Sequence, residues 1–306
     1  MNKKILLLAG ILALGATSFA AEGTRDFLDT FKDVIAPKEN ITGYWNQEFT
    51  GYSDTEATDD KKMRLQNEIG LNLTDKVSVA LRTRTYMDYP GKEQKGSDNF
   101  RFDMSYNNGN IADTELGLSQ RVRMYREGSK AEAYSYRPNI SFASYVGATS
   151  ADANLEFFHV RNTGTDDVQK IAYDIDVTWN LGHGFSTEAD FSGAVTTTSG
   201  VATESALDLT LLYDHNLYTS TDEATTLAFH AEAGVIPIKY NHKDNEMHSS
   251  KAMVIETETY MKLKRNWTNN FNTYGTVGVT TSDDVRTHTS NFGTQGYVAL
   301  GLSYAM

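Results

Sequence analysis

Charged side chains recur at alternate positions in many segments of this chain, and their sign changes between its two halves. Side chains at alternate positions of a β-strand share one face, so each set is expected to line a common surface. We call them the basic wall and the acidic wall. The basic wall is Arg64, Arg82, Arg84, Arg101, Arg121, Arg123 and Arg137, and the acidic wall is Asp174, Asp176, Glu188, Asp190, Asp208, Glu232, Glu256 and Glu258. Charged surfaces of this kind attract and steer ions and polar solutes.

Other kinds of chemistry find little support in the sequence. Catalysis by a serine or a histidine requires a second group placed to activate it. Four histidines are expected in loops, His183 in a Gly-His-Gly turn and His230 on an inner face, which leaves only His159 in a strand where it could face lipid. The histidines expected in loops are His215, His242, His248 and His288. We therefore expect no enzyme, no metal site and no cofactor.

The segment from Met63 to Met87 shows which element positions the charges. Apolar residues alternate with polar ones in two long runs, which are joined by Thr74, Asp75 and Lys76. This pattern predicts a β-hairpin with one apolar face and one charged face. Each run has about eleven residues, the length at which a tilted strand crosses a bilayer.

The same alternation continues from Ile41 to the end of the chain and predicts fourteen strands, although twelve or sixteen would also fit the pattern. The seventh run is ambiguous because Phe157 and Phe158 are adjacent. The runs cover 41–52, 63–73, 77–87, 99–106, 114–125, 134–146, 153–160, 171–181, 185–195, 204–213, 225–236, 252–264, 271–280 and 292–306. An even number of such strands predicts an all-β fold, a transmembrane up-and-down antiparallel barrel with both termini on one side.

The first forty residues differ from the rest of the chain. Lys3, Lys4, an apolar run and a small-residue cleavage signal at 18–20 predict a signal peptide over residues 1–20. Residues 21–40 contain a short amphipathic helix pattern, which could form a plug inside the barrel or a periplasmic segment, and the barrel is expected over 41–306. Removing the signal takes two lysines from 28 basic residues and leaves 26 against 40 acidic ones, so nucleic acid is not an expected partner. The chain has no cysteine, so we expect a closed hydrogen-bonded ring to replace disulfides.

The connections between the runs alternate in length. Every second connection is short, with the segment from Asp214 to Glu223 as an exception, and the others are longer and polar, as in 239–251. Short turns face the periplasm in bacterial barrels. Aromatic residues lie near strand ends, and the four prolines are expected to avoid strand centres.

In these features the chain resembles Gram-negative outer-membrane porins, and in size and strand number the monomeric fourteen-stranded type. The resemblance covers everything after residue 40 and rests on architecture, since no diagnostic motif is present. Family members usually end in an aromatic residue, whereas this chain ends Ser303-Tyr304-Ala305-Met306. The resemblance implies an outer-membrane location, contact with lipid and lipopolysaccharide, insertion by the barrel-assembly machinery, and passive diffusion of small hydrophilic solutes and ions.

Two alternatives to a diffusion channel remain open. The barrel could display its loops as a surface adhesin for host or bacterial ligands, or it could be a gated channel for one class of solute. Within a channel, strands about seven apart face each other, so the basic and acidic walls would create a transverse field. The alternative is that these charges pair locally as a salt-bridge network.

Overall fold

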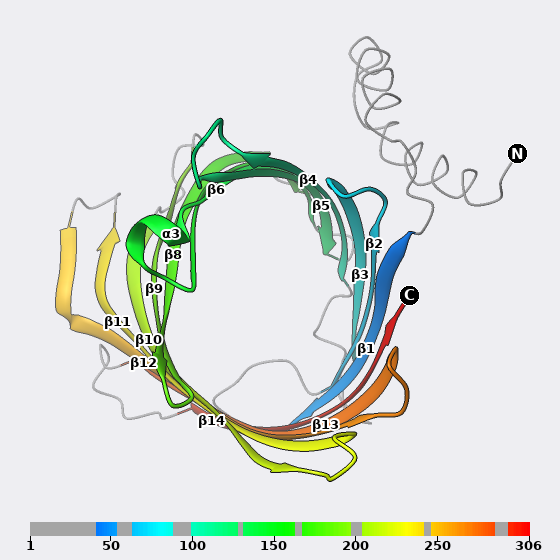
Figure 1. Ribbon diagram of the computed structural model, residues 1–306. Coiled ribbons are helices and arrows are strands. Elements are labelled where there is room, and N and C mark those ends of the chain that lie inside the picture. The colour runs from blue at the N-terminus through cyan, green and yellow to red at the C-terminus, as the bar shows by residue number, and fades with distance from the viewer. Residues whose placement is uncertain are drawn as a thin grey trace, which may run out of the picture.

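The computed structural model is a closed ring of fourteen antiparallel strands in which each strand pairs with its neighbours in sequence (Figure 1). It describes residues 41–53, 63–87, 99–127, 131–162, 167–196, 204–241, 246–284 and 293–306. The strands are β1 (Thr42–Tyr52), β2 (Met63–Asn72), β3 (Val77–Met87), β4 (Asn99–Asn110), β5 (Gly117–Glu127), β6 (Ala131–Ser141), β7 (Ser150–Asn162), β8 (Val168–Gly182), β9 (Phe185–Thr196), β10 (Glu204–Thr219), β11 (Thr225–Asn241), β12 (Glu246–Asn266), β13 (Phe271–Asp284) and β14 (Gly293–Ala305). The predicted fold class and the number of strands are confirmed.

The first and last strands close the ring. Trp45 of β1 lies opposite Tyr304 of β14, and the register continues to Tyr52 opposite Tyr297. At the end of this ladder, Gly43 of β1 and Met306, which follows β14, exchange two backbone hydrogen bonds of 3.1 and 2.8 Å. In the closed ring every described strand has a paired neighbour on both sides, which removes the free edge strands through which sheets aggregate.

The hairpin of β2 and β3 forms as predicted. Met63 lies opposite Met87, and Asn72 lies opposite Ser78. In the turn, the Thr74 hydroxyl accepts hydrogen bonds of 3.1 and 2.9 Å from the backbone N–H groups of Lys76 and Val77. A side chain that satisfies turn N–H groups in this way allows two long strands to reverse within a few residues.

The segment from Asp214 to Glu223 was predicted to be a long connection, and this prediction is wrong. β10 continues to Thr219, and only residues 220–224 connect it to β11. A register shift between Asn216 and Tyr218 places a bulge in this part of the strand, which breaks the alternation that would have revealed it. In the turn, hydrogen bonds from the Ser220 hydroxyl and the Ala224 N–H hold the pKa of Asp222 below its ordinary value.

Residues 239–251 were also predicted to form a loop, but β11 runs to Asn241 and β12 begins at Glu246. Pro237 lies inside β11, at a register shift between Ile236 and Ile238. Pro138 likewise lies inside β6, where no pairing with β7 is present at 137–138. Proline lacks the backbone N–H that a regular ladder uses as a donor. Both prolines are tolerated because they lie at irregular positions, where the ladder does not need that hydrogen bond.

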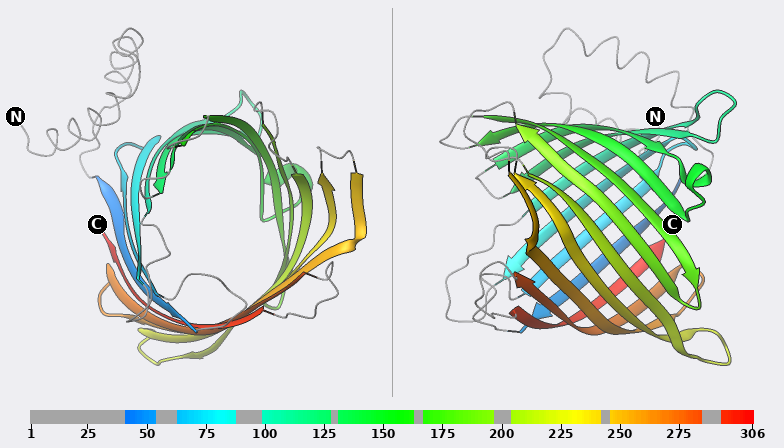
Figure 2. Two further views of the ribbon diagram at one scale, coloured as in Figure 1. Left: turned by 180° about the vertical axis from the view of Figure 1, so that it is seen from behind. Right: turned by 90° about the vertical axis from the view of Figure 1, so that its left-hand side faces the viewer.

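The described connections at one end of the barrel are short, and both described termini lie at that end (Figure 2). Here the predicted sixth strand proves shorter than expected. β6 ends at Ser141, and the short helix α3 (Ala143–Val146) follows. Within the described ranges, no helix is long and apolar enough to cross a membrane. The predicted signal peptide and the segment 21–40 lie outside the described residues.

Candidate functional site

The two faces of the sheet differ in chemistry, as strand alternation requires. On one face, large apolar side chains are exposed, among them Leu81 at 38% and Ile175 at 41%. The residues next to them in sequence, Arg82 and Asp176, belong to the opposite face. A hollow of about 490 Å³ on that face is lined by residues from β4 to β8. They include Arg121 of the basic wall and Asp176 of the acidic wall. A hollow shared by five consecutive strands of a closed ring lies on its concave side, so this face is the inner one.

The ambiguous strand β7 is resolved by its exposure. Leu155 and Phe157 are 46% and 43% exposed and share the apolar outer face, whereas Glu156 is buried on the inner face. His159 therefore lies on the outer face, where its Nε2 is 3.4 Å from a carboxylate oxygen of Asp167. Sequence reasoning missed Glu156 because two adjacent phenylalanines obscured the alternation.

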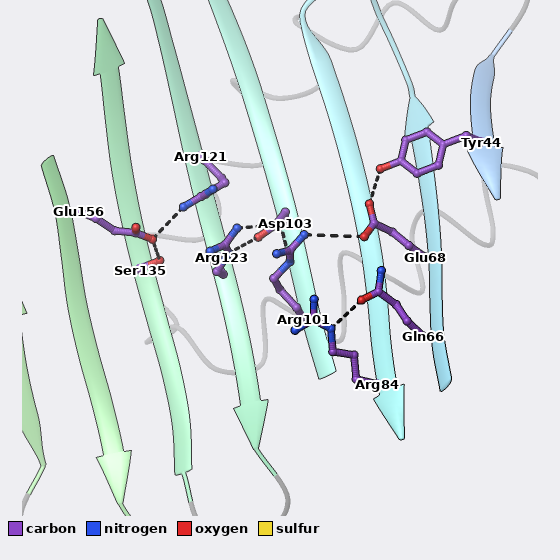
Figure 3. A network of polar contacts seen from close by, with 10 residues as sticks. All are labelled: Tyr44, Gln66, Glu68, Arg84, Arg101, Asp103, Arg121, Arg123, Ser135 and Glu156. Atoms are coloured by element: carbon purple, nitrogen blue, oxygen red, sulfur yellow. Dashed lines mark hydrogen bonds and ion pairs between the residues drawn. The ribbon is translucent and has the colours of Figure 1, made fainter. Parts of the chain in front are cut away.

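Arginines of the basic wall are held by acidic partners on their own or nearby strands (Figure 3). Arg123 makes a two-point contact with Asp103 at 2.6 and 3.2 Å, and Arg101 binds the same carboxylate at 2.9 Å. Arg121 lies 3.0 Å from Glu156, which also accepts a hydrogen bond from the Ser135 hydroxyl. Two-point contacts of arginine with a carboxylate fix the orientation of the guanidinium as well as its charge.

Of the other four arginines, two have a carboxylate partner, and Nε of Arg82 is buried without a hydrogen-bond partner among the described residues. Arg64 pairs with Glu48 at 2.9 Å, and Arg137 reaches Asp174 of the acidic wall at 3.3 Å. Arg84 instead donates to the amide oxygen of Gln66 at 2.6 Å. The alternative of local pairing is therefore confirmed for Arg64, Arg101, Arg121, Arg123 and Arg137. Sequence reasoning missed Glu48. Its place on this face could have been predicted, because it directly precedes Phe49, which shares the outer face with Trp45.

The acidic wall has a different arrangement. Four aspartates lie directly opposite one another across β7, β8, β9 and β10, and we call them the aspartate row: Asp152, Asp176, Asp190 and Asp208. Glu232 and Glu258 form a further opposed pair between β11 and β12. Like charges in directly opposed positions destabilise a sheet, so the sequence maintains this concentration of carboxylates at a cost in stability.

Cations near the acidic wall are few. In the described ranges, Asp174 forms an ion pair with Arg137, and Nε2 of His230 lies 3.6 Å from the carboxylate of Glu232. His230 is 8% exposed, contacts Asp214 through Nδ1 at 2.8 Å and stacks on Tyr260. It is thus on the inner face as predicted, whereas His215 lies in β10 and not in a loop. Among the described residues, no group of three or more histidines and acids could hold a metal ion.

Tyrosines lie across glycines of the neighbouring strand on the inner face. A Cβ atom built on Gly301 would lie 2.2 Å from the ring of Tyr274, and one on Gly70 would lie 2.3 Å from the ring of Tyr44. Each tyrosine hydroxyl then donates to a glutamate, Tyr274 to Glu48 at 2.7 Å and Tyr44 to Glu68 at 2.6 Å. Glycine is required there because any side chain would displace the ring, and the tyrosine hydroxyls in turn hold glutamates that pair with Arg64 and Arg101 of the basic wall.

Replacing Gly301 with valine is expected to destabilise the barrel by about 1 to 3 kcal/mol through overpacking. The Tyr274 ring must move, and its bond to Glu48 is lost. Urea unfolding of the refolded protein measures the change. The matched control is Gly51→Val, because a Cβ at Gly51 meets no atom within 4 Å. Equal destabilisation by both variants would contradict the role assigned to the tyrosine.

No protein-family model matches this chain, and no curated protein matches its sequence. The solved structures to which this chain is similar include the following three. A loop-deletion mutant of OmpT, an outer membrane protein of Vibrio cholerae, is 10% identical, with 87% of this chain and 98% of that chain covered and a TM-score of 0.39. The outer membrane channel DcaP of Acinetobacter baumannii is 9% identical, with coverages of 87% and 96% and a TM-score of 0.42. A bacterial polysaccharide outer membrane secretin is 7% identical, with coverages of 88% and 99% and a TM-score of 0.46.

Proposed function

We propose that this chain is an outer-membrane porin that forms a water-filled channel for passive diffusion of small hydrophilic solutes and ions. The observation that carries the proposal is the contrast between the two faces of one closed ring of fourteen strands. The outer face exposes apolar side chains along the strands, whereas the inner face carries both charged walls and hollows of about 490 to 660 Å³. Barrels larger than eight strands have room for water inside.

The dimensions of the strands support the membrane part of this proposal. The shortest, β2, has 10 residues and the longest, β12, has 21, and a tilted strand needs about 9 to 11 residues to cross a bilayer. Exposed aromatic side chains such as Phe185, Trp267 and Tyr304 lie near the strand ends on the side of the short turns. Aromatic residues at the edge of the apolar band form an interfacial girdle in outer-membrane barrels. Lipid and lipopolysaccharide are accordingly the proposed surroundings, and the barrel-assembly machinery the proposed insertion partner.

The charge balance of the inner face favours cations and cationic solutes. Most arginines of the basic wall are within ion-pairing distance of carboxylates, so their charge is largely compensated. The aspartate row has much less compensation, since the arginine ion pair described for the acidic wall is that of Asp174 with Arg137. Selectivity must come from side chains, because the backbone groups of a regular barrel are used in its ladder.

Purified, refolded protein is expected to form discrete, cation-preferring channels when added to a planar lipid bilayer. An increase in conductance proportional to the bulk salt concentration would indicate a water-filled path. The control is the same preparation kept unfolded in urea before dilution. If the folded protein inserts into vesicles but conducts no ions, the channel proposal is wrong, and a barrel that acts through its surface loops becomes the better explanation.

Both termini are proposed to lie in the periplasm, together with the turns at 74–76 and 183–184. Protease treatment of intact cells is expected to cleave the opposite connections and to spare Asp75 and His183. Of the sites expected to be extracellular, Asp167 is described and lies between β7 and β8, whereas Asp59, Lys95 and Asn245 lie outside the described residues. Cleavage at Asp75 with protection at Asp167 would mean that the barrel has the opposite orientation to the one proposed.

A further inference from the structure

An amide pair interrupts the apolar outer face at the middle of β1 and β2. Gln47 and Asn67 lie directly opposite each other, and Nε2 of Gln47 donates to Oδ1 of Asn67 at 2.8 Å. Their neighbours on the same face, Trp45, Phe49 and Ile69, are large, apolar and exposed. The pair therefore occupies the depth at which the proposed membrane is most apolar.

The bond between the two amides leaves much of their hydrogen-bonding capacity unused. A primary amide has two N–H donors and an oxygen acceptor. Among the described residues, no further partner contacts Oε1 of Gln47 or Nδ2 of Asn67. By contrast, the outward Gln120 is near a strand end, where it donates to Asn108 and accepts from the Tyr136 hydroxyl. Hydrocarbon offers no donor or acceptor, so each unsatisfied group costs several kcal/mol.

We infer that the outer face of β1 to β3 around Gln47 and Asn67 binds a second copy of this chain across a two-fold axis. A two-fold interface joins the same patch on both subunits, so the patch must complement itself. The amide pair meets this condition because it presents both a free acceptor and free donors. Gln47 of one copy accepts from Asn67 of the other, and the reciprocal bond forms by symmetry. Thr83, opposite Asn67 on β3, adds a hydroxyl to the patch.

This inference rests on the proposed placement in a membrane, and the oligomeric state tests it. Light scattering of the full protein in mild detergent is expected to give a dimer. The double variant Gln47→Leu/Asn67→Leu is expected to give a monomer with half the protein mass, because leucine suits a lipid-facing position. The matched control, Asn46→Leu/Gln66→Leu, removes the same two amide types from the inner face of the same strands and should remain dimeric. A monomeric or trimeric parent protein, or a double variant that remains dimeric, would overturn the inference.

Cross-linking tests the location of the interface. Since the chain has no cysteine, Thr83→Cys introduces a single thiol beside the amide pair and is expected to give a covalent dimer on oxidation. Ala189→Cys, on the outer face of β9 on the far side of the ring, should stay monomeric. Equal cross-linking at both sites would overturn the location. Conductance separates this inference from the proposed function, because a monomeric double variant should still conduct if the channel proposal is correct.

Discussion

Replacing Asp174, Asp176, Glu188 and Asp190 with their amides is expected to remove the cation preference of the channel and shift it towards anions. A carboxylate about 10 Å from a passing ion contributes about 0.4 kcal/mol at the dielectric constant of water. Four such charges together change the local ion concentration by roughly tenfold at low salt. The fold should survive, because Asp176 and Asp190 are opposed across β8 and β9 and the substitution relieves their repulsion.

Reversal potentials across a salt gradient measure this shift. The effect should be largest near 0.01 M salt, where the screening length is about 30 Å, and small at 1 M, where it is about 3 Å. The comparison variant neutralises Arg82, Arg84, Arg121 and Arg123 and should raise both cation preference and conductance, since Glu156 then loses its arginine and Asp103 retains only Arg101. Unchanged reversal potentials in both variants at low salt would contradict the role of both walls.

Arginine at Ile175 is expected to destabilise the folded barrel by about 2 to 4 kcal/mol, the cost of a lipid-facing arginine at the bilayer midplane. Ile175 lies at the middle of β8 on the outer face and is 41% exposed. Arginine at Thr178, on the inner face of the same strand, should be tolerated. Urea titration of folding into lipid vesicles, followed by electrophoretic mobility, compares the two.

Depth along the strand gives a second control. Leu71 is on the outer face but lies next to the end of β2, so Leu71→Arg should cost only about 0 to 1 kcal/mol, as expected near the interface. Val177, between the centre and the end of β8, should give an intermediate value. Equal costs at Ile175 and Thr178 would mean that the assignment of the two faces is wrong.

The class of fold and the faces of most strands could be predicted from the alternation of apolar and polar residues in the sequence. Alternation is a property of each strand alone, so Met63 to Met87 could be recognised as a hairpin without knowledge of any partner. The same reasoning placed the members of both walls on one face. It failed where the alternation was broken, at the bulge after Asp214, at Pro237 and at Phe157 and Phe158, because an extra residue or two adjacent aromatic residues hide the period of two.

The partner of each charged side chain could not be predicted from the sequence, because it depends on how the strands are aligned in the folded barrel. Cross-strand neighbours depend on the register of each pair, which turns and bulges set over the whole ring. That register brings Arg121 to Glu156 and aligns the aspartate row across four strands. It also sets Gln47 against Asn67 on the outer face, a pairing that neither strand reveals alone. Local pattern determines which face a side chain occupies, whereas long-range pairing determines its partner.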